Sequence, residues 1–100
     1  MRVVFLLKVK GGTVRDRIAR RAQWQYPEGL NVVSEHWLWS NDPALPNVIL
    51  ICEPDDNMGG PVLAAFAEWD DVFDITILPA FTAEEGLKLG QQMMQEAQEG

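Results

Sequence analysis

The chain opens on an apolar run that is followed by a segment with helical spacing. Residues 2–9 are rich in Val, Phe and Leu and are closed by two glycines, a pattern that predicts a strand. Thr13 and Asp16, three positions later, have the form of an N-terminal helix cap, and apolar residues then recur every fourth position. The pattern therefore predicts a strand and then a helix that ends near Trp24.

The remaining chain predicts three more strands and two more helices. The strands are rich in β-branched and aromatic residues, whereas a proline near the first helical position and a second capping box open the helices. We expect strands over residues 30–39, 47–52 and 72–78, and helices over residues 61–69 and from Thr82 through Met93. Pro79 is expected to stop the fourth strand, and the Gln- and Glu-rich tail is expected to fray.

The order of the predicted elements indicates the fold class. Strand, helix, strand, strand, helix, strand, followed by one extra helix, matches the ferredoxin-like βαββαβ arrangement, an α+β fold. Its four-stranded antiparallel sheet has the spatial order 4-1-3-2 and carries both helices on one face. We expect a single domain over residues 1–100, with the ferredoxin-like core in 1–80 and the C-terminal helix and frayed tail in 81–100.

Two of the predicted strands are apolar on both faces. Residues 3–7 of the first strand and residues 48–52 of the third are apolar throughout. Both strands are central in the sheet and two helices can cover only one face, so the second face is also expected to be buried. The expected cover is a second copy of the chain, which would give a two-fold homodimer of the dimeric α/β-barrel type. The alternative is the C-terminal helix folding across its own sheet.

Three short motifs add a resemblance to a known family. The motifs are Pro27-Glu28-Gly29-Leu30 before a Trp-bearing strand, Glu53-Pro54-Asp55-Asp56 after the third strand, and Trp69-x-Asp71-x-Phe73-Asp74-Ile75 before Pro79. With these motifs, residues 1–85 resemble a family of short prokaryotic domains of unknown function that is related to the dimeric α/β barrels. The resemblance implies a fold and carries over no catalytic residue.

Charge and cysteine content exclude several classes of partner. The formal net charge is −7, so nucleic acid and anionic membranes would repel the protein as a whole. The single cysteine, Cys52, cannot form an intrachain disulfide and is expected to be a small buried hydrophobe. The apolar run over residues 3–7 is too short for a membrane span or a signal peptide. We therefore expect a cytoplasmic protein with no nucleic-acid or membrane partner.

Four tryptophans in 100 residues are candidates for a pocket lining. Trp37 and Trp39 share the second strand and Trp69 ends the second helix, so we expect these three as walls of a cavity between sheet and helices. Packing of the core and of the dimer by the same side chains is the alternative interpretation. The first hypothesis is therefore a homodimeric small-molecule binding or sensing module that takes a small apolar ligand and no cofactor.

His36 and Glu53 are the candidate catalytic residues if the protein is an enzyme. Cofactor-independent monooxygenases and isomerases occur on dimeric α/β barrels, and one of these side chains would have to line the cavity and move a proton. A haem held by His36 and a Cys52–His36 nucleophilic pair are further alternatives. The loop with Glu53, Asp55 and Asp56 lacks the glycine and ligand alternation of a calcium loop, so we expect no metal site.

Half of the basic residues lie on the first predicted helix. They are Arg15, Arg17, Arg20 and Arg21. An acidic partner could dock on this face, which makes a structural interaction protein the third hypothesis. A solvated helix face is the alternative explanation, since Asp16 and Arg20 form an ordinary i,i+4 pair.

Overall fold

Strands and helices alternate in the predicted order. The computed structural model describes residues 1–55 and 59–99. Within these residues the elements are β1 (Arg2–Val9), α1 (Val14–Gln23), β2 (Val32–Trp37), β3 (Val48–Cys52), α2 (Gly60–Trp69), β4 (Phe73–Ala80) and α3 (Ala83–Glu99). No helix in the same residues is long and apolar enough to span a bilayer.

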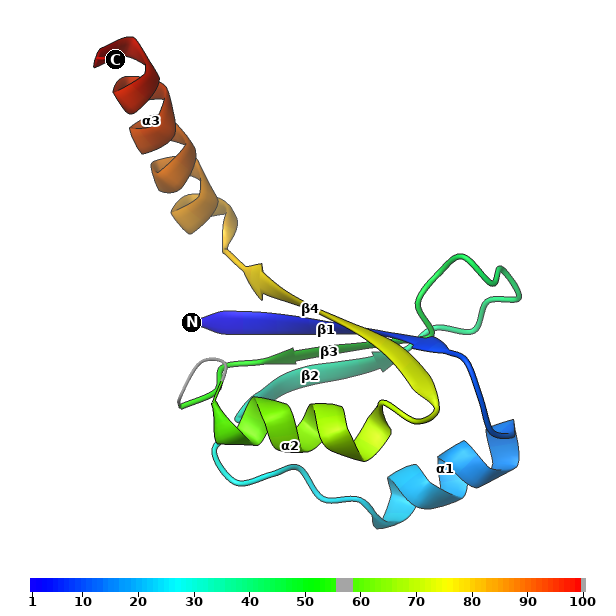
Figure 1. Ribbon diagram of the computed structural model, residues 1–100. Helices are drawn as coiled ribbons and strands as arrows, with labels where there is room; N and C mark the ends of the chain where they lie inside the picture. Colours follow the sequence, from blue (N-terminus) through cyan, green and yellow to red (C-terminus); the bar gives the residue numbers. More distant parts are fainter. Residues whose placement is uncertain (56–58, 100) are drawn as a thin grey trace.

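One antiparallel sheet carries two of the helices. The strand order is β2-β3-β1-β4, which is the predicted order 4-1-3-2 counted from the other edge. Helices α1 and α2 lie on one face of this sheet (Figure 1). The α+β class, the βαββαβ order and the extra C-terminal helix are thus confirmed.

The core lies between the sheet and α2. Every second residue of β1, namely Val3, Phe5 and Leu7, faces the helices and is buried, and Val62 and Trp69 of α2 pack against this row. Cys52 of β3 belongs to the same cluster and is fully buried, as expected. Burial raises the pKa of the Cys52 thiol to about 11, so it stays protonated.

Helix α1 contributes nothing to this buried core. It begins at Thr13, whose Oγ1 accepts a hydrogen bond from the backbone N–H of Asp16 at 3.1 Å, as the capping pattern predicts. None of its residues is buried, and Val14 and Ile18 on its apolar stripe remain 55% and 43% exposed. The helix therefore leaves space between itself and the sheet.

The second face of the sheet is open in the single chain. Val4 and Leu6 of β1 pair with Ile51 and Ile49 of β3, and all four side chains point away from α1 and α2 and are half-buried. Helix α3 leaves the end of β4 and points away from the sheet (Figure 1). The alternative expectation, that this helix folds across its own sheet, is therefore wrong.

Several boundaries differ from those expected, and β2 covers only Val32–Trp37 of the expected residues 30–39. β4 continues through Pro79 to Ala80, because β4 is an edge strand and an edge position tolerates the missing N–H of proline. Helix α3 does not fray after Met93 but continues to Glu99. Its capping box forms as predicted: Thr82 N donates to Glu85 Oε1 at 2.9 Å, and Glu85 N donates to Thr82 Oγ1 at 3.1 Å.

A bulge in β2 decides which of its side chains face the helices. Val32 pairs with Cys52 and Ser34 pairs with Ile51, so Val33 is one residue in excess. Strict alternation from Val32 would turn His36 toward the helices. The bulge shifts the alternation by one, so Glu35 and Trp37 face the helices and His36 lies on the open face of the sheet.

Candidate functional site

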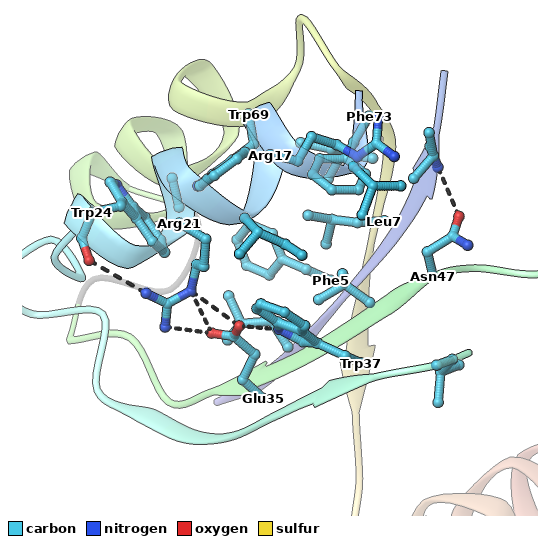
Figure 2. A pocket seen from close by; sticks show the side chains of 18 of the residues that line it. Phe5, Leu7, Arg17, Arg21, Trp24, Glu35, Trp37, Asn47, Trp69 and Phe73 are labelled. Atoms are coloured by element: carbon cyan, nitrogen blue, oxygen red, sulfur yellow. Dashed lines mark hydrogen bonds and ion pairs between the residues drawn. The ribbon is translucent and has the colours of Figure 1, made fainter. Parts of the chain in front are cut away.

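The space beneath α1 is a cavity of about 250 Å³. Its lining comes from the helix-facing residues of the sheet, the apolar stripe of α1 and the inner side of α2 (Figure 2). Most of the lining side chains are apolar, with Phe5 and Leu50 of the sheet and Ala65 of α2 among them. An apolar hollow with a few placed polar groups is the usual form of a small-molecule site.

The three tryptophans expected as walls all lie on this cavity. Trp37 and Trp39 line it from β2 and the following loop, and Trp69 lines it from α2. Trp69 is 5% exposed, whereas Trp39 is 83% exposed. A fourth, Trp24, also lines the cavity and packs edge-to-face on Trp69 with ring centroids 5.7 Å apart. The cavity thus has one fixed aromatic wall and one wall open to solvent.

A carboxylate with four donors forms one end of the cavity. Glu35 accepts hydrogen bonds from Arg21 Nη2 at 2.9 Å and Arg21 Nε at 3.0 Å. Tyr26 Oη and Trp37 Nε1 donate to the same carboxylate, each at 2.6 Å. Arg21 also donates to the backbone oxygen of Trp24 at 3.3 Å. These bonds join α1, the following loop and β2 around one partly buried charge pair, and Figure 2 shows the bonds among Arg21, Trp24, Glu35 and Trp37.

The protonation of this pair follows from its contacts. Burial opposes ionisation of Glu35, but the hydrogen bonds from Arg21, Tyr26 and Trp37 outweigh it and lower the pKa of the carboxyl. The hydrogen bonds to Glu35 raise the pKa of Arg21 against the opposing effect of burial. Both groups are therefore charged at neutral pH.

Two polar side chains, those of Arg17 and Asn47, lie at the other end of the cavity. Arg17 Nη1 donates to the backbone oxygen of Gly11 at 2.6 Å, which fixes the guanidinium near the end of β1. Asn47 accepts from the backbone N–H of Val9 through Oδ1 at 2.9 Å. Both Arg17 and Asn47 line the cavity.

Neither candidate catalytic residue lines the cavity. His36 is exposed on the open face of the sheet, opposite Ile49. Glu53 follows β3 and forms an ion pair with Arg2 at 2.7 Å. Its neighbour Asp55 accepts a hydrogen bond from Asn31 Nδ2 at 2.7 Å, and Asp56 lies outside the described residues.

The arginines of α1 do not form a free basic face. Arg17 and Arg21 turn toward the cavity, and Arg20 forms ion pairs with Glu68 at 3.3 Å and with Asp71 at 3.0 Å. Arg20 also stacks over the ring of Trp69, with 4.7 Å between the guanidinium carbon and the ring centroid. Two of the four arginine charges of this helix, those of Arg20 and Arg21, are therefore paired within the chain.

Sequence reasoning missed the polar groups of the cavity. Arg17 and Arg21 could have been found, because they follow Val14 and Ile18 at helical spacing and so share the face that α1 turns to the sheet. Glu35 could not have been found, because the bulge at Val33 decides which face of the sheet its side chain lies on.

Fold and cavity together define an α+β domain with a single antiparallel sheet and an aromatic-lined hollow between that sheet and its helices. The chain belongs to a family described as a domain of unknown function (DUF3303), which matches residues 8–94. The expectation of a family of unknown function is confirmed. No curated protein and no solved structure matches the chain.

Proposed function

We propose that the protein is a homodimeric module that binds or senses a small molecule in the cavity beneath α1. The observation that carries the proposal is the cavity itself, whose apolar lining includes Trp37, Trp39 and Trp69. At about 250 Å³ it lies just below the ~300–1,000 Å³ common for ligand pockets. The ligand is therefore small, about the size of one or two fused rings.

Binding of neutral aromatic probes tests this proposal. We expect benzamide or 2-naphthamide to bind one site per chain, measured by isothermal titration calorimetry. Trp39→Ala should weaken that binding about tenfold, because a stacking wall is lost while the fold keeps its core. Phe81→Ala is the matched control, since Phe81 is 51% exposed and lies away from the cavity lining. Equal loss of binding in the two variants contradicts the proposal, and so does absence of binding by both amides together with their carboxylate analogues, benzoate and 2-naphthoate.

The homodimer is the second part of the proposal. The chain carries two apolar surfaces that it does not bring together: the open face of the sheet, and the stripe of α3 with Leu87, Met93 and Met94. A second copy can cover both, since each copy offers the same pair of surfaces. Packing of two open faces would give the ferredoxin-like, dimeric α/β-barrel arrangement expected from the sequence.

A cofactor-independent enzyme has less support. That hypothesis needs His36 or Glu53 on the cavity lining, and the described residues place both outside it. The carboxylate that does line the cavity, Glu35, is held ionised by three neighbours. Binding is therefore the function that the geometry favours.

A further inference from the structure

The charge of the cavity lining is opposite in sign to that of the protein. Among the described residues the charged ones on the lining are Arg17, Arg21 and Glu35, so two positive charges and one negative charge leave a balance of +1. The chain as a whole carries −7. A positive, partly desolvated cavity in an acidic protein favours an anion over a neutral or cationic ligand.

The excess charge belongs to Arg17. Glu35 accepts hydrogen bonds from Arg21, Tyr26 and Trp37. The negative charge of Glu35 and the positive charge of Arg21 therefore compensate one another. Arg17 forms no ion pair within residues 1–55 and 59–99, and its hydrogen bond there goes to the backbone oxygen of Gly11. A guanidinium has five N–H donors, so donors besides the one bound to Gly11 are available to a ligand.

Asn47 adds a donor at the same end of the cavity. Its Oδ1 accepts from Val9 N, which turns the Nδ2 amide away from the strand as a donor with no partner in the described residues. Arg17 is hydrogen-bonded to Gly11, and Asn47 is hydrogen-bonded to Val9. Val9 is the last residue of β1, and Gly11 follows it by two positions. Figure 2 shows both at the end of the cavity away from Arg21 and Glu35.

We propose that the cavity takes a small amphipathic anion, an aromatic or aliphatic carboxylate. Its acid group is bound by Arg17 and Asn47, and its apolar body lies against Phe5, Leu50 and Trp69. Guanidinium and carboxylate match in shape and form short, charge-assisted hydrogen bonds, which are stronger where the site is partly dry. The inference rests on the proposed function and names the class of ligand for the same site.

A pair of isosteric probes tests the inference. 2-Naphthoate and 2-naphthamide share one apolar body and differ in charge. We expect the wild-type protein to bind the naphthoate at least about tenfold more tightly than the amide, measured by calorimetry at low salt. Arg17→Gln should abolish this preference and change affinity for the amide by less than about threefold. Arg15→Gln on the same helix is the matched control and should keep the preference, since Arg15 is exposed and lies off the lining.

Asn47→Asp gives a second, independent variant. Aspartate keeps the oxygen that accepts from Val9 N but replaces the amide donor with a negative charge. It should weaken naphthoate binding by at least about tenfold and spare the amide. Thermal unfolding of each variant shows whether the fold is retained.

The outcomes separate the two proposals. Equal affinity of the wild-type protein for both probes overturns the anion inference and leaves the binding function intact. Binding of neither probe overturns the binding function. A naphthoate preference that survives both Arg17→Gln and Asn47→Asp overturns the assignment of these residues as the anion site.

Discussion

At the scale of single residues, Glu35 joins α1 and the loop after it to β2. Its side chain is 13% exposed, and its carboxylate receives hydrogen bonds from Arg21, Tyr26 and Trp37. A charge in such a position is stabilising only while its partners are present, because each partner offsets part of the cost of desolvation. The bonds therefore tie α1 to the sheet across a cavity that no apolar core fills.

We expect Glu35→Gln to lower the free energy of unfolding by about 2 kcal/mol. Glutamine keeps the shape but leaves Arg21 without a counter-charge and turns an amide N–H₂ toward one of the donors. Chemical denaturation measures the loss. Glu68→Gln is the matched control, because the Arg20–Glu68 pair is more exposed, with side chains 34% and 43% accessible, and should cost less than about 1 kcal/mol. Equal losses in the two variants contradict this assignment.

The same contact predicts a dependence on pH. The pKa of Glu35 is lower in the folded protein than its ordinary value of 4.5, so the unfolded chain binds the proton more readily. Its contribution to stability is complete above the ordinary value and is lost as pH falls through the folded pKa. The stability difference between wild type and Glu35→Gln should therefore shrink below about pH 4.5. A difference that stays constant from pH 7 to pH 3 would show that Glu35 does not act through its charge.

At the scale of elements, the turn before β2 holds the edge strand to β3. Gly29 has a φ of +88° and Asn31 a φ of +53°, and the Gly29 oxygen accepts from Asp55 N at 2.9 Å. Asn31 Nδ2 also donates to the backbone oxygen of Glu53 at 3.0 Å. Glycine adopts a positive φ freely, and asparagine is one of the few other residues that tolerates it. This explains why Gly29 and Asn31 occupy these two positions.

We expect Gly29→Ala to lower the free energy of unfolding by about 1–2 kcal/mol. An alanine there would be held at a strained positive φ, and its Cβ would lie 3.2 Å from Pro61 Cγ and 3.3 Å from Asp55 Oδ2. Gly86→Ala is the control, because nothing lies within 4 Å of a Cβ at that helical position. Stability should not fall in the control, since alanine favours the helix. Thermal unfolding compares the two, and an unchanged midpoint for Gly29→Ala would contradict a strained turn.

The elements and the order of the strands could be predicted, because apolar periodicity and turn residues act locally. The N-terminal cap at Thr13 and the capping box at Thr82 formed as their spacing predicted. The candidate site depended on two features with no local signal. The bulge at Val33 decides whether His36 or Glu35 faces the helices, and the distance of α1 from the sheet decides whether Val14 and Ile18 fill a core or line a cavity.

At the scale of the whole molecule, the single chain is more extended than its length requires. The radius of gyration is 16.4 Å, whereas a compact chain of this length has about 13 Å. The principal extents of 55 × 33 × 19 Å reflect α3, which stands away from the sheet. Its apolar residues are largely in water, with Leu87, Met93 and Met94 each more than 60% exposed. Such a helix favours an assembly in which these side chains are covered.

We expect the protein to be a dimer in solution by light scattering coupled to size exclusion. Leu6→Lys and the milder Leu78→Lys place a charge on the open face of the sheet and should give monomers. Leu63→Lys is the matched control, because Leu63 is 63% exposed on α2, on the helix-covered side. It should remain dimeric. A monomeric wild type, or dissociation of the control alone, would contradict the face-to-face dimer.

The bulge also bears on how this chain can change length in evolution. Val33 is the residue in excess, and its side chain is 50% exposed. Loss of its codon leaves a regular ladder in which Glu35 and Trp37 keep their places. Loss of the Glu35 codon leaves the same ladder with Ser34 where the carboxylate was. These two one-residue deletions in β2 would thus give the same fold. Only the loss of Val33 would leave Arg21 with its partner Glu35.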